Sequence, residues 1–146
     1  MRTAGFSGLH IIYDLPHVSS IQRLYLTLSG FTEVSAQDMS QREEHGFCLI
    51  VDENLDSTFN FLKSSNIRVG FVATWSLSES PMSVRERILP RFCHVCERYL
   101  IAFQPFWEGI DNVDYFSAFA TFRPELNWFK EEMPRAVPPA SWYLFA

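Results

Sequence analysis

Five short, mostly apolar runs alternate along the chain with segments in which apolar residues recur every three or four positions. The runs occupy residues 9–14, 47–51, 69–75, 99–103 and 142–145. Each has the length of a strand, and continuous apolar runs are typical of strands covered on both faces, as in parallel sheets. Strands that alternate with helices predict an α/β fold with a mostly parallel sheet.

The first helix is predicted by an apolar stripe that runs from Val18 to Leu28 at helical spacing. Pro16 suits the first turn, because a first turn leaves its N–H groups without helical partners anyway. Gly30 suits the C-terminal cap, since glycine adopts the left-handed conformation at little cost. We therefore expect a helix between Pro16 and Gly30 that presents one apolar face.

Three further helices are expected between the later strands. Residues 55–62 and 112–122 predict two of them. In the third, Ser80 suits the N-cap position and Pro81 the first helical position. Pro90 should kink or end this helix, because proline has no N–H to donate to the preceding turn.

Composition and charge narrow the class of protein. The chain has 146 residues, of which 47% are hydrophobic, enough for a single globular domain over residues 1–146. A net charge of −5 argues against nucleic acid as a partner, because phosphate contacts need clustered Lys and Arg. No apolar run approaches the roughly 20 residues that cross a bilayer, so no membrane partner is expected. Three cysteines predict no disulfide framework, and we expect a cytoplasmic protein with reduced thiols.

Polar groups at the strand ends are the candidate ligand contacts, since open α/β sheets bind ligands at the carboxyl ends of their strands. Asp14 ends the first apolar run, and Asp52 ends the second. An acid at such a strand tip is typical of a ribose clamp. The alternatives are ordinary helix starts, with Asp14 opening the turn into the first helix and Asp52 capping the second.

Two later segments are denser in polar and aromatic groups. Residues 74–81 place four hydroxyls, an indole and a carboxylate directly after a strand, as in a wall that contacts cofactor and substrate. The alternative is a polar loop that caps a helix, which leaves Trp75 and Glu79 unexplained. Residues 104–112 mix amides and carboxylates with aromatic rings, which suits a sugar-like ligand. The alternative is a surface loop whose Phe106 and Trp107 pack into the core.

The segment Cys93-His94-Val95-Cys96 has the spacing of a zinc or thiol redox motif. Zinc needs four ligands, and only Cys48 and three distant histidines remain in the chain. A redox motif would have to follow a strand and open a helix. We therefore expect no metal site here, and buried, inert thiols.

Taken in chain order, six segments resemble the bacterial sugar O-methyltransferases, which are S-adenosylmethionine-dependent enzymes with a Rossmann-like fold. The matching segments are 5–8 (GFSG), 11–16 (IIYDLP), 72–81 (VATWSLSESP), 99–104 (YLIAFQ), 109–116 (GIDNVDYF) and 142–145 (WYLF). The segments at 74–79 and 109–112 are fairly specific, and the others are common to many α/β folds. The resemblance covers nearly the whole chain and implies a three-layer Rossmann-like domain.

For the cofactor, the resemblance implies contacts at three strand ends. Asp14, with Leu15 beside it, would hold the ribose of S-adenosylmethionine. Asp52 would lie near the adenine. Thr74 and Trp75 would lie beside the methionine part.

For the acceptor, the resemblance implies that Ser76, Gln104 and Asn112 contact a sugar. It identifies no general base, and Glu79 and Asp111 are our candidates for that role. Methyl transfer needs in-line positioning of an acceptor oxygen and a base for its proton.

One departure from the family is large. The family's first strand and glycine-rich loop, which hold the methionine end of the cofactor, have no counterpart before residue 9. The missing strand is central in the family, between the strands matched by 9–14 and 69–75. We expect those two strands either to pair directly or to leave an open slot that invites association. The chain is then an N-terminally truncated methyltransferase fold: a fragment, half of a split protein, or a diverged domain.

The leading hypothesis is methylation of a sugar hydroxyl, complete only if another segment supplies the glycine loop. Its partners would be a small sugar acceptor and either a complementing N-terminal segment or a second copy of the chain. The rival is a non-catalytic binding or assembly module derived from the same fold. A third hypothesis is an α/β domain that uses Asp14 for another nucleotide.

Overall fold

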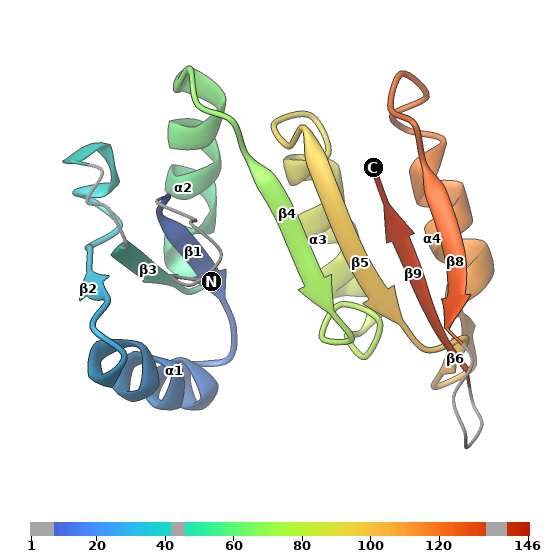
Figure 1. Ribbon diagram of the computed structural model, residues 1–146, viewed down its shortest axis with the longest axis horizontal. Helices are drawn as coiled ribbons and strands as arrows, with labels where there is room; N and C mark the ends of the chain where they lie inside the picture. Colours follow the sequence, from blue (N-terminus) through green and yellow to red (C-terminus); the bar gives the residue numbers. More distant parts are fainter. Residues whose placement is uncertain (1–7, 42–45, 134–139) are drawn as a thin grey trace. The chain divides into compact units, whose positions relative to one another are not determined.

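The structure is a computed structural model that describes residues 8–41, 46–133 and 140–146 (Figure 1). It has a mixed α/β fold, with four α-helices among these residues. Its contacts divide the chain into two units, Met1–Ser64 and Ser65–Ala146. We call them the N-terminal and the C-terminal unit. The expectation that residues 1–146 form one domain stays a prediction.

The N-terminal unit holds a small parallel sheet. Its strands are β1 (His10–Tyr13), β2 (Thr32–Glu33) and β3 (Gly46–Ile50), in the order β1-β3-β2. Its helices are α1 (Pro16–Leu28), α2 (Asp52–Ser64) and a short 3-10 helix (Met39–Gln41). The central strand carries the core, since Phe47 and Cys48 have no exposed surface. The predicted strands are thus confirmed, and the predicted helix at 55–62 is longer than expected.

Helix α1 begins at Pro16 and ends before Gly30, as predicted. Gly30 follows the helix with φ +82°, as a C-terminal cap requires. Most of the stripe is exposed, however, with 68% of Ile21, 63% of Leu24 and 79% of Leu28 open to solvent. Helical spacing reveals which residues share a face, but it carries no information about what covers that face.

The C-terminal unit holds a four-stranded mixed sheet. Its strands are β4 (Gly70–Thr74), β5 (Arg98–Phe103), β8 (Phe129–Met133) and β9 (Ser141–Phe145), in the order β4-β5-β9-β8. Strands β4 and β5 are parallel, whereas β9 runs antiparallel to both β5 and β8. The sequence reasoning missed β8. Its residues are exposed and largely charged, so they lack the apolar signal of the other strands.

Helices α3 (Met82–Phe92) and α4 (Asn112–Ala120) lie on the same face of this sheet (Figure 1). The core between them and the sheet uses alternate residues of β5, since Ile101 and Phe103 are both fully buried. The ring of Phe103 lies 4.7 Å from that of Phe116 on α4, between centroids. The opposite face of the sheet is more open, and Val72 is 64% and Phe129 58% exposed.

Helix α3 differs from the prediction at both ends. Its N-cap is Pro81 rather than Ser80, and no side chain caps it. The Ser80 hydroxyl donates instead to the carbonyl of Ser76, 2.7 Å away. At the other end the helix continues past Pro90 to Phe92, and the N–H of Cys93 donates to the carbonyl of Leu89 at 2.9 Å. Proline is tolerated here because it removes only one hydrogen bond from the last turn.

A small hairpin fills the predicted loop before α4. Strands β6 (Phe106–Trp107) and β7 (Ile110–Asp111) are antiparallel. The two residues between them, Glu108 and Gly109, have φ values of +46° and +82°. Two consecutive residues with positive φ make the tight hairpin turn whose twist matches that of the strands. The loop at 104–112 was predicted, but its two short strands were not. Helix α4 ends at Ala120 rather than at the predicted residue 122.

Strands β1 and β4 belong to different sheets, and each is the terminal strand of its own sheet. Of the two expected alternatives, direct pairing between these strands is therefore absent from the described residues. Within those residues, the strand neighbour of β1 is β3 and that of β4 is β5. An unpaired edge exposes backbone N–H and C=O groups that can pair with another strand.

Cys93 and Cys96 are buried, as predicted, and the burial of Cys96 is expected to make the free energy of unfolding depend on pH in the alkaline range. Cys96 is 1% exposed, and burial raises the pKa of its thiol to about 12 from an ordinary value of 9.0. Above pH 9 the unfolded chain loses this proton while the folded chain keeps it. The free energy of unfolding is therefore expected to be steady below pH 9 and to fall as the pH rises toward 12.

Denaturant titrations at half-unit pH steps check this dependence. Between pH 9 and 10 the Cys96→Ala variant should lose less stability per pH unit than the unchanged chain. Equal slopes would mean that the Cys96 thiol does not contribute to the alkaline loss.

Candidate functional site

The carboxyl ends of β4 and β5 carry a hydrogen-bonded polar cluster. The two strands are parallel and adjacent, with Thr74 opposite Ala102, so the loops that follow them emerge at one edge of the sheet. The Gln104 amide nitrogen donates to Oε1 of Glu79 at 3.2 Å. The Ser78 hydroxyl lies 2.9 Å from Oε1 of Gln104. We call Ser78, Glu79, Gln104 and Asn112 the edge cluster.

Glu79 and Gln104 are the members of the edge cluster that reach solvent. Glu79 is exposed and Gln104 is half-buried. Their contact also orients the amide, because its nitrogen faces a carboxylate and its oxygen faces a hydroxyl. A carboxylate and an amide held side by side in this way can accept and donate hydrogen bonds to a hydroxyl-rich ligand.

Asn112 is the buried anchor of the cluster and has no exposed surface. Its amide nitrogen donates to the carbonyl of Gln104 at 2.9 Å, and its backbone N–H donates to the carbonyl of Pro105 at 2.8 Å. The side-chain oxygen accepts from Arg85 at 2.7 Å. The residue predicted to touch the acceptor therefore holds the two loops together in this arrangement.

Arg85, on α3, is a fully buried cation that holds the same loops. Besides Asn112, its guanidinium donates to the carbonyls of Ser78 at 2.5 Å and Ser80 at 2.9 Å. It also packs over the ring of Tyr115, 5.1 Å from the centroid. Its acceptors are all neutral, and burial lowers the pKa of Arg85 while Tyr115 opposes that shift. Arginine suits this position because its fork of N–H groups can serve three acceptors at once.

The sequence reasoning missed Arg85, although a signal for it was present. Arg85, Ile88 and Leu89 are the buried residues of α3, and their spacing is that of one helix face. A basic residue on the apolar face of a helix is a candidate for a buried, hydrogen-bonded group.

Trp75 begins the loop after β4 in a strained backbone conformation, with φ +60°. Such a conformation costs a residue other than glycine about 1–3 kcal/mol and is common at ligand sites. The loop is held by the N–H of Trp75, which donates to the carbonyl of Ala102 at 2.8 Å. The indole is half-buried, while Thr74 and Ser76 are exposed. Three predicted contact residues thus lie beside the edge cluster.

Asp111 serves as the N-cap of α4. Its carboxylate accepts the N–H of Asp114 at 3.0 Å. This use explains the acid at that position without a catalytic role, so Glu79 becomes the stronger candidate for a general base.

In the N-terminal unit, the two predicted cofactor acids lie at the ends of neighbouring parallel strands. Asp14 follows β1 and Asp52 follows β3, where Tyr13 stands opposite Ile50. The Tyr13 hydroxyl donates to the Asp52 carboxylate. Asp14 and Asp52 thus lie at one edge of this sheet, and the contact between Tyr13 and Asp52 was not predicted.

Asp14 already accepts two hydrogen bonds within the fold. Its carboxylate takes the N–H of Leu15 at 2.8 Å and the side-chain amide of Gln22 at 2.9 Å. Leu15 itself is 60% exposed beside it. A carboxylate offers about four acceptor positions, so ribose hydroxyls can still bind to the half-buried Asp14.

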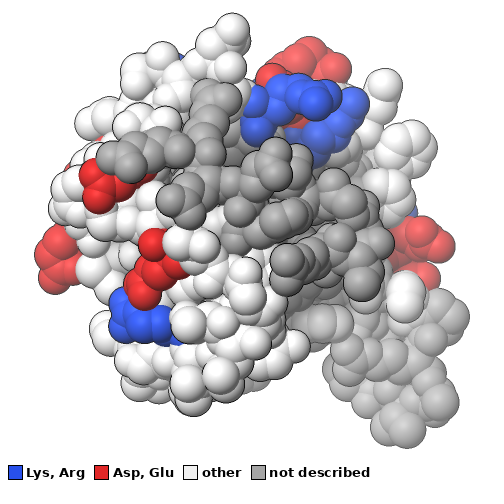
Figure 2. Space-filling model, turned by 60° about the vertical axis from the view of Figure 1, so that its left-hand side comes forward, with Lys and Arg blue, Asp and Glu red and all other residues white. Residues whose placement is uncertain are grey.

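The described residues contain no group of three or more His, Cys, Asp and Glu arranged to hold a metal ion. No helix of the described segments is both long and apolar enough to cross a bilayer. On the face drawn in Figure 2, acidic and basic side chains of the described residues are scattered over a mostly uncharged surface. Among the described residues visible on that face, Lys and Arg form no continuous patch of the kind that binds a phosphate backbone.

Comparisons of the chain with protein-family models, curated proteins and solved structures found no match. Its function is therefore inferred from its own residues.

Proposed function

We propose that the chain is a methyltransferase-type domain that acts on a sugar hydroxyl, with the edge cluster as its acceptor site. The observation that carries this proposal is the contact between Glu79 and Gln104, held from below by the buried Arg85 and Asn112. Open α/β sheets bind their ligands at this edge.

The groups in reach of solvent suit a sugar. Gln104 and Glu79 offer donors and an acceptor for hydroxyl groups, and the exposed Ser76 adds a hydroxyl. The half-buried indole of Trp75 offers a flat apolar surface beside them. In methyl transfer, the Glu79 carboxylate would accept the proton of the acceptor hydroxyl.

S-adenosylmethionine fits the chain in part. Asp14 would accept hydrogen bonds from the ribose, and Asp52, in the first turn of α2, would lie near the adenine. The bound cofactor would supply a methyl group activated by its sulfonium. The described glycines with positive φ are Gly30 and Gly109, and neither follows a strand in the manner of a glycine-rich cofactor loop. No transfer step is therefore assigned to this chain alone.

The proposal includes a complementing segment, which can come from another polypeptide or from a second copy of the chain. Among the described residues, β1 and β4 are each the terminal strand of their own sheet, and a terminal strand can pair with a further strand.

The second candidate function is a non-catalytic binding module, and two observations favour it. The Asp14 carboxylate is already bonded to Leu15 and Gln22, and Asp111 is used as a helix cap. Such a module would keep the sugar contacts without the cofactor.

Calorimetric titration separates the two candidates. The methyltransferase proposal predicts binding of S-adenosylhomocysteine at millimolar concentration or tighter, and at least tenfold weaker binding to the Asp14→Asn variant, about 1.4 kcal/mol. If titration with S-adenosylhomocysteine releases no heat, methyl transfer by this chain alone is excluded, and the non-catalytic binding module remains as the candidate function.

A matched pair of variants tests the acceptor site. Titration with methyl glycosides, followed by amide NMR shifts, should show binding that the Gln104→Ala change weakens about tenfold. Glu108→Gln, an exposed change in the hairpin turn of the same unit, should leave it unchanged. If Gln104→Ala and Glu108→Gln change the glycoside affinity equally, the edge cluster is not the acceptor site.

A further inference from the structure

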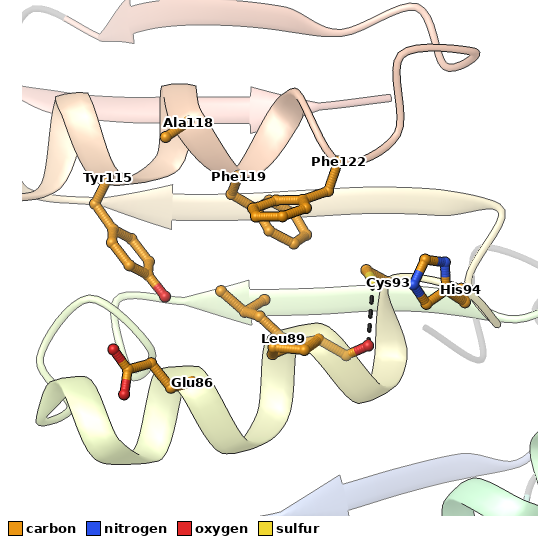
Figure 3. A pocket seen from close by; sticks show the side chains of 9 residues that line it. Glu86, Leu89, Cys93, His94, Tyr115, Ala118, Phe119 and Phe122 are labelled. Carbon is orange, nitrogen blue, oxygen red and sulfur yellow. Dashed lines mark hydrogen bonds between the residues drawn. The ribbon is translucent and has the colours of Figure 1, made fainter.

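A pocket of about 350 Å³ opens between α3 and α4, away from the residues of the edge cluster (Figure 3). A volume of this size suits a small organic ligand. Most of the wall is apolar. Leu89 of α3 and Phe119 of α4 are almost fully buried in it, and Ala118 and Phe122 line the α4 side.

The rings of Phe119 and Phe122 point into the space between the two helices (Figure 3). Phe122 is 68% exposed, so a large apolar surface lies open to water at this wall. Covering such surface with the apolar body of a ligand is favourable by about 25 cal/mol per Å². The wall therefore selects an aromatic or aliphatic body.

One end of the pocket carries the carboxylate of Glu86, from α3, and the hydroxyl of Tyr115, from α4 (Figure 3). The carboxylate oxygens of Glu86 accept hydrogen bonds, and the hydroxyl of Tyr115 can accept one as well.

Among the described residues, no Lys or Arg lines the pocket, although the charge of the buried Arg85 still acts on Tyr115. Arg85 packs over the ring of Tyr115, but its N–H groups are bonded to Ser78, Ser80 and Asn112, and it does not line the pocket. At the other end, the Cys93 thiol donates to the carbonyl of Pro90 at 3.1 Å, and His94 adds an imidazole. Glu86 is therefore the one carboxylate among the pocket's lining residues.

We propose that this pocket binds a small organic cation, with its apolar body against Leu89, Phe119 and Phe122 and its ammonium group at Glu86 and Tyr115. An ammonium has donors and no acceptor, so it matches the acceptors at this end. A carboxylate ligand would instead meet the Glu86 charge. The net charge of −5 on the chain also favours a cation. This site is independent of the proposed sugar site.

Three probes of one shape test the charge preference: 4-butylbenzylammonium, 4-butylbenzyl alcohol and 4-butylbenzoate. Amide NMR shifts at Cys93, Ala118 and Phe119 report occupancy. The ammonium should bind at least tenfold more tightly than the alcohol, about 1.4 kcal/mol, and the benzoate most weakly. Tightest binding of the benzoate, or no shift with any probe at millimolar concentration, would overturn the proposal.

Two variants and a control test the location. Glu86→Gln should weaken the ammonium about tenfold and leave the alcohol unchanged. Ala118→Trp should fill the pocket and abolish the binding of all three probes. Ser83→Trp adds the same indole to an exposed position of α3 outside the pocket and should change nothing.

Unchanged binding to the Ala118→Trp variant would place the probes elsewhere and overturn the proposal. So would a chain that sediments as a dimer and becomes monomeric on the Ala118→Trp change, because the occupant would then be a second copy.

Discussion

Replacing Arg85 by methionine is expected to destabilise the C-terminal unit by about 3 kcal/mol or more. Methionine fills a similar volume but donates nothing. The carbonyl of Ser80 and the side-chain oxygen of Asn112 then lose the Arg85 donor, and the carbonyl of Ser78 keeps only the amide nitrogen of Asn112 at 3.4 Å. Each unsatisfied buried acceptor costs about 1–3 kcal/mol, and this loss outweighs the relief of no longer burying a charge.

Tryptophan fluorescence is a suitable measurement, because all four tryptophans of the chain lie in the C-terminal unit. Urea titration followed by this signal should show a lower midpoint for Arg85→Met. Arg85→Lys keeps the charge but lacks the planar guanidinium. Its urea midpoint should therefore lie between that of Arg85→Met and that of the unchanged chain.

The matched control is Arg23→Met in the N-terminal unit. Arg23 forms an exposed ion pair with Glu33 at 2.9 Å. Exposed pairs contribute about 0–1 kcal/mol, so this change should have a small effect on the unfolding of its own unit, followed by circular dichroism. If Arg85→Met lowers the free energy of unfolding no more than Arg23→Met does, the hydrogen bonds of the buried cation do not stabilise the C-terminal unit.

Replacing Phe116 by alanine is expected to destabilise the C-terminal unit by about 3–5 kcal/mol. Phe116 has no exposed surface, and its ring lies 4.7 Å from that of Phe103 and 5.1 Å from that of Tyr115, between centroids. Its removal opens a cavity at the junction of α4 with the sheet. The guanidinium of Arg85, 5.9 Å from the ring, also loses a neighbour.

The comparison for this change is Phe129→Ala. Phe129 is 58% exposed and stacks on Phe145, with 5.6 Å between the ring centroids. Its truncation should cost about 1 kcal/mol. The two midpoints, measured by tryptophan fluorescence under the same conditions, should differ widely. Similar midpoints would contradict the burial of Phe116.

The local parts of the fold were predictable, because a strand or helix leaves a periodic pattern in its own residues. The strand at 99–103 and the start of α1 at Pro16 follow from such patterns. Strand β8 was not predictable in this way, since its exposed and charged residues reveal a strand only through their pairing with β9. The exposure of the apolar stripe of α1 was not predictable either, because it depends on which other segments pack against that helix.

The sequence predicted which strand ends carry polar residues, and it did not predict the contacts that these residues make within the fold. Polar residues after β4 and β5 pointed to one edge of the sheet, and Glu79 and Gln104 do meet there. Asp111 was expected to act on a ligand but caps a helix, and Asn112 lies buried beneath the surface. Which atoms remain open to solvent depends on packing, and packing is absent from a pattern of residue types.

By itself, the sequence determined the succession of strands and helices and the polar strand ends, because each rests on residues close together in the chain. Only the tertiary structure decided that Arg85, which is not itself a member of the edge cluster, is buried next to it and holds its loops in place. Its three acceptors come from the loop after β4 and from the first residue of α4. Arg85 and Asn112 lie 27 positions apart in the chain, and no local pattern indicates their contact, so only the folded chain can reveal it.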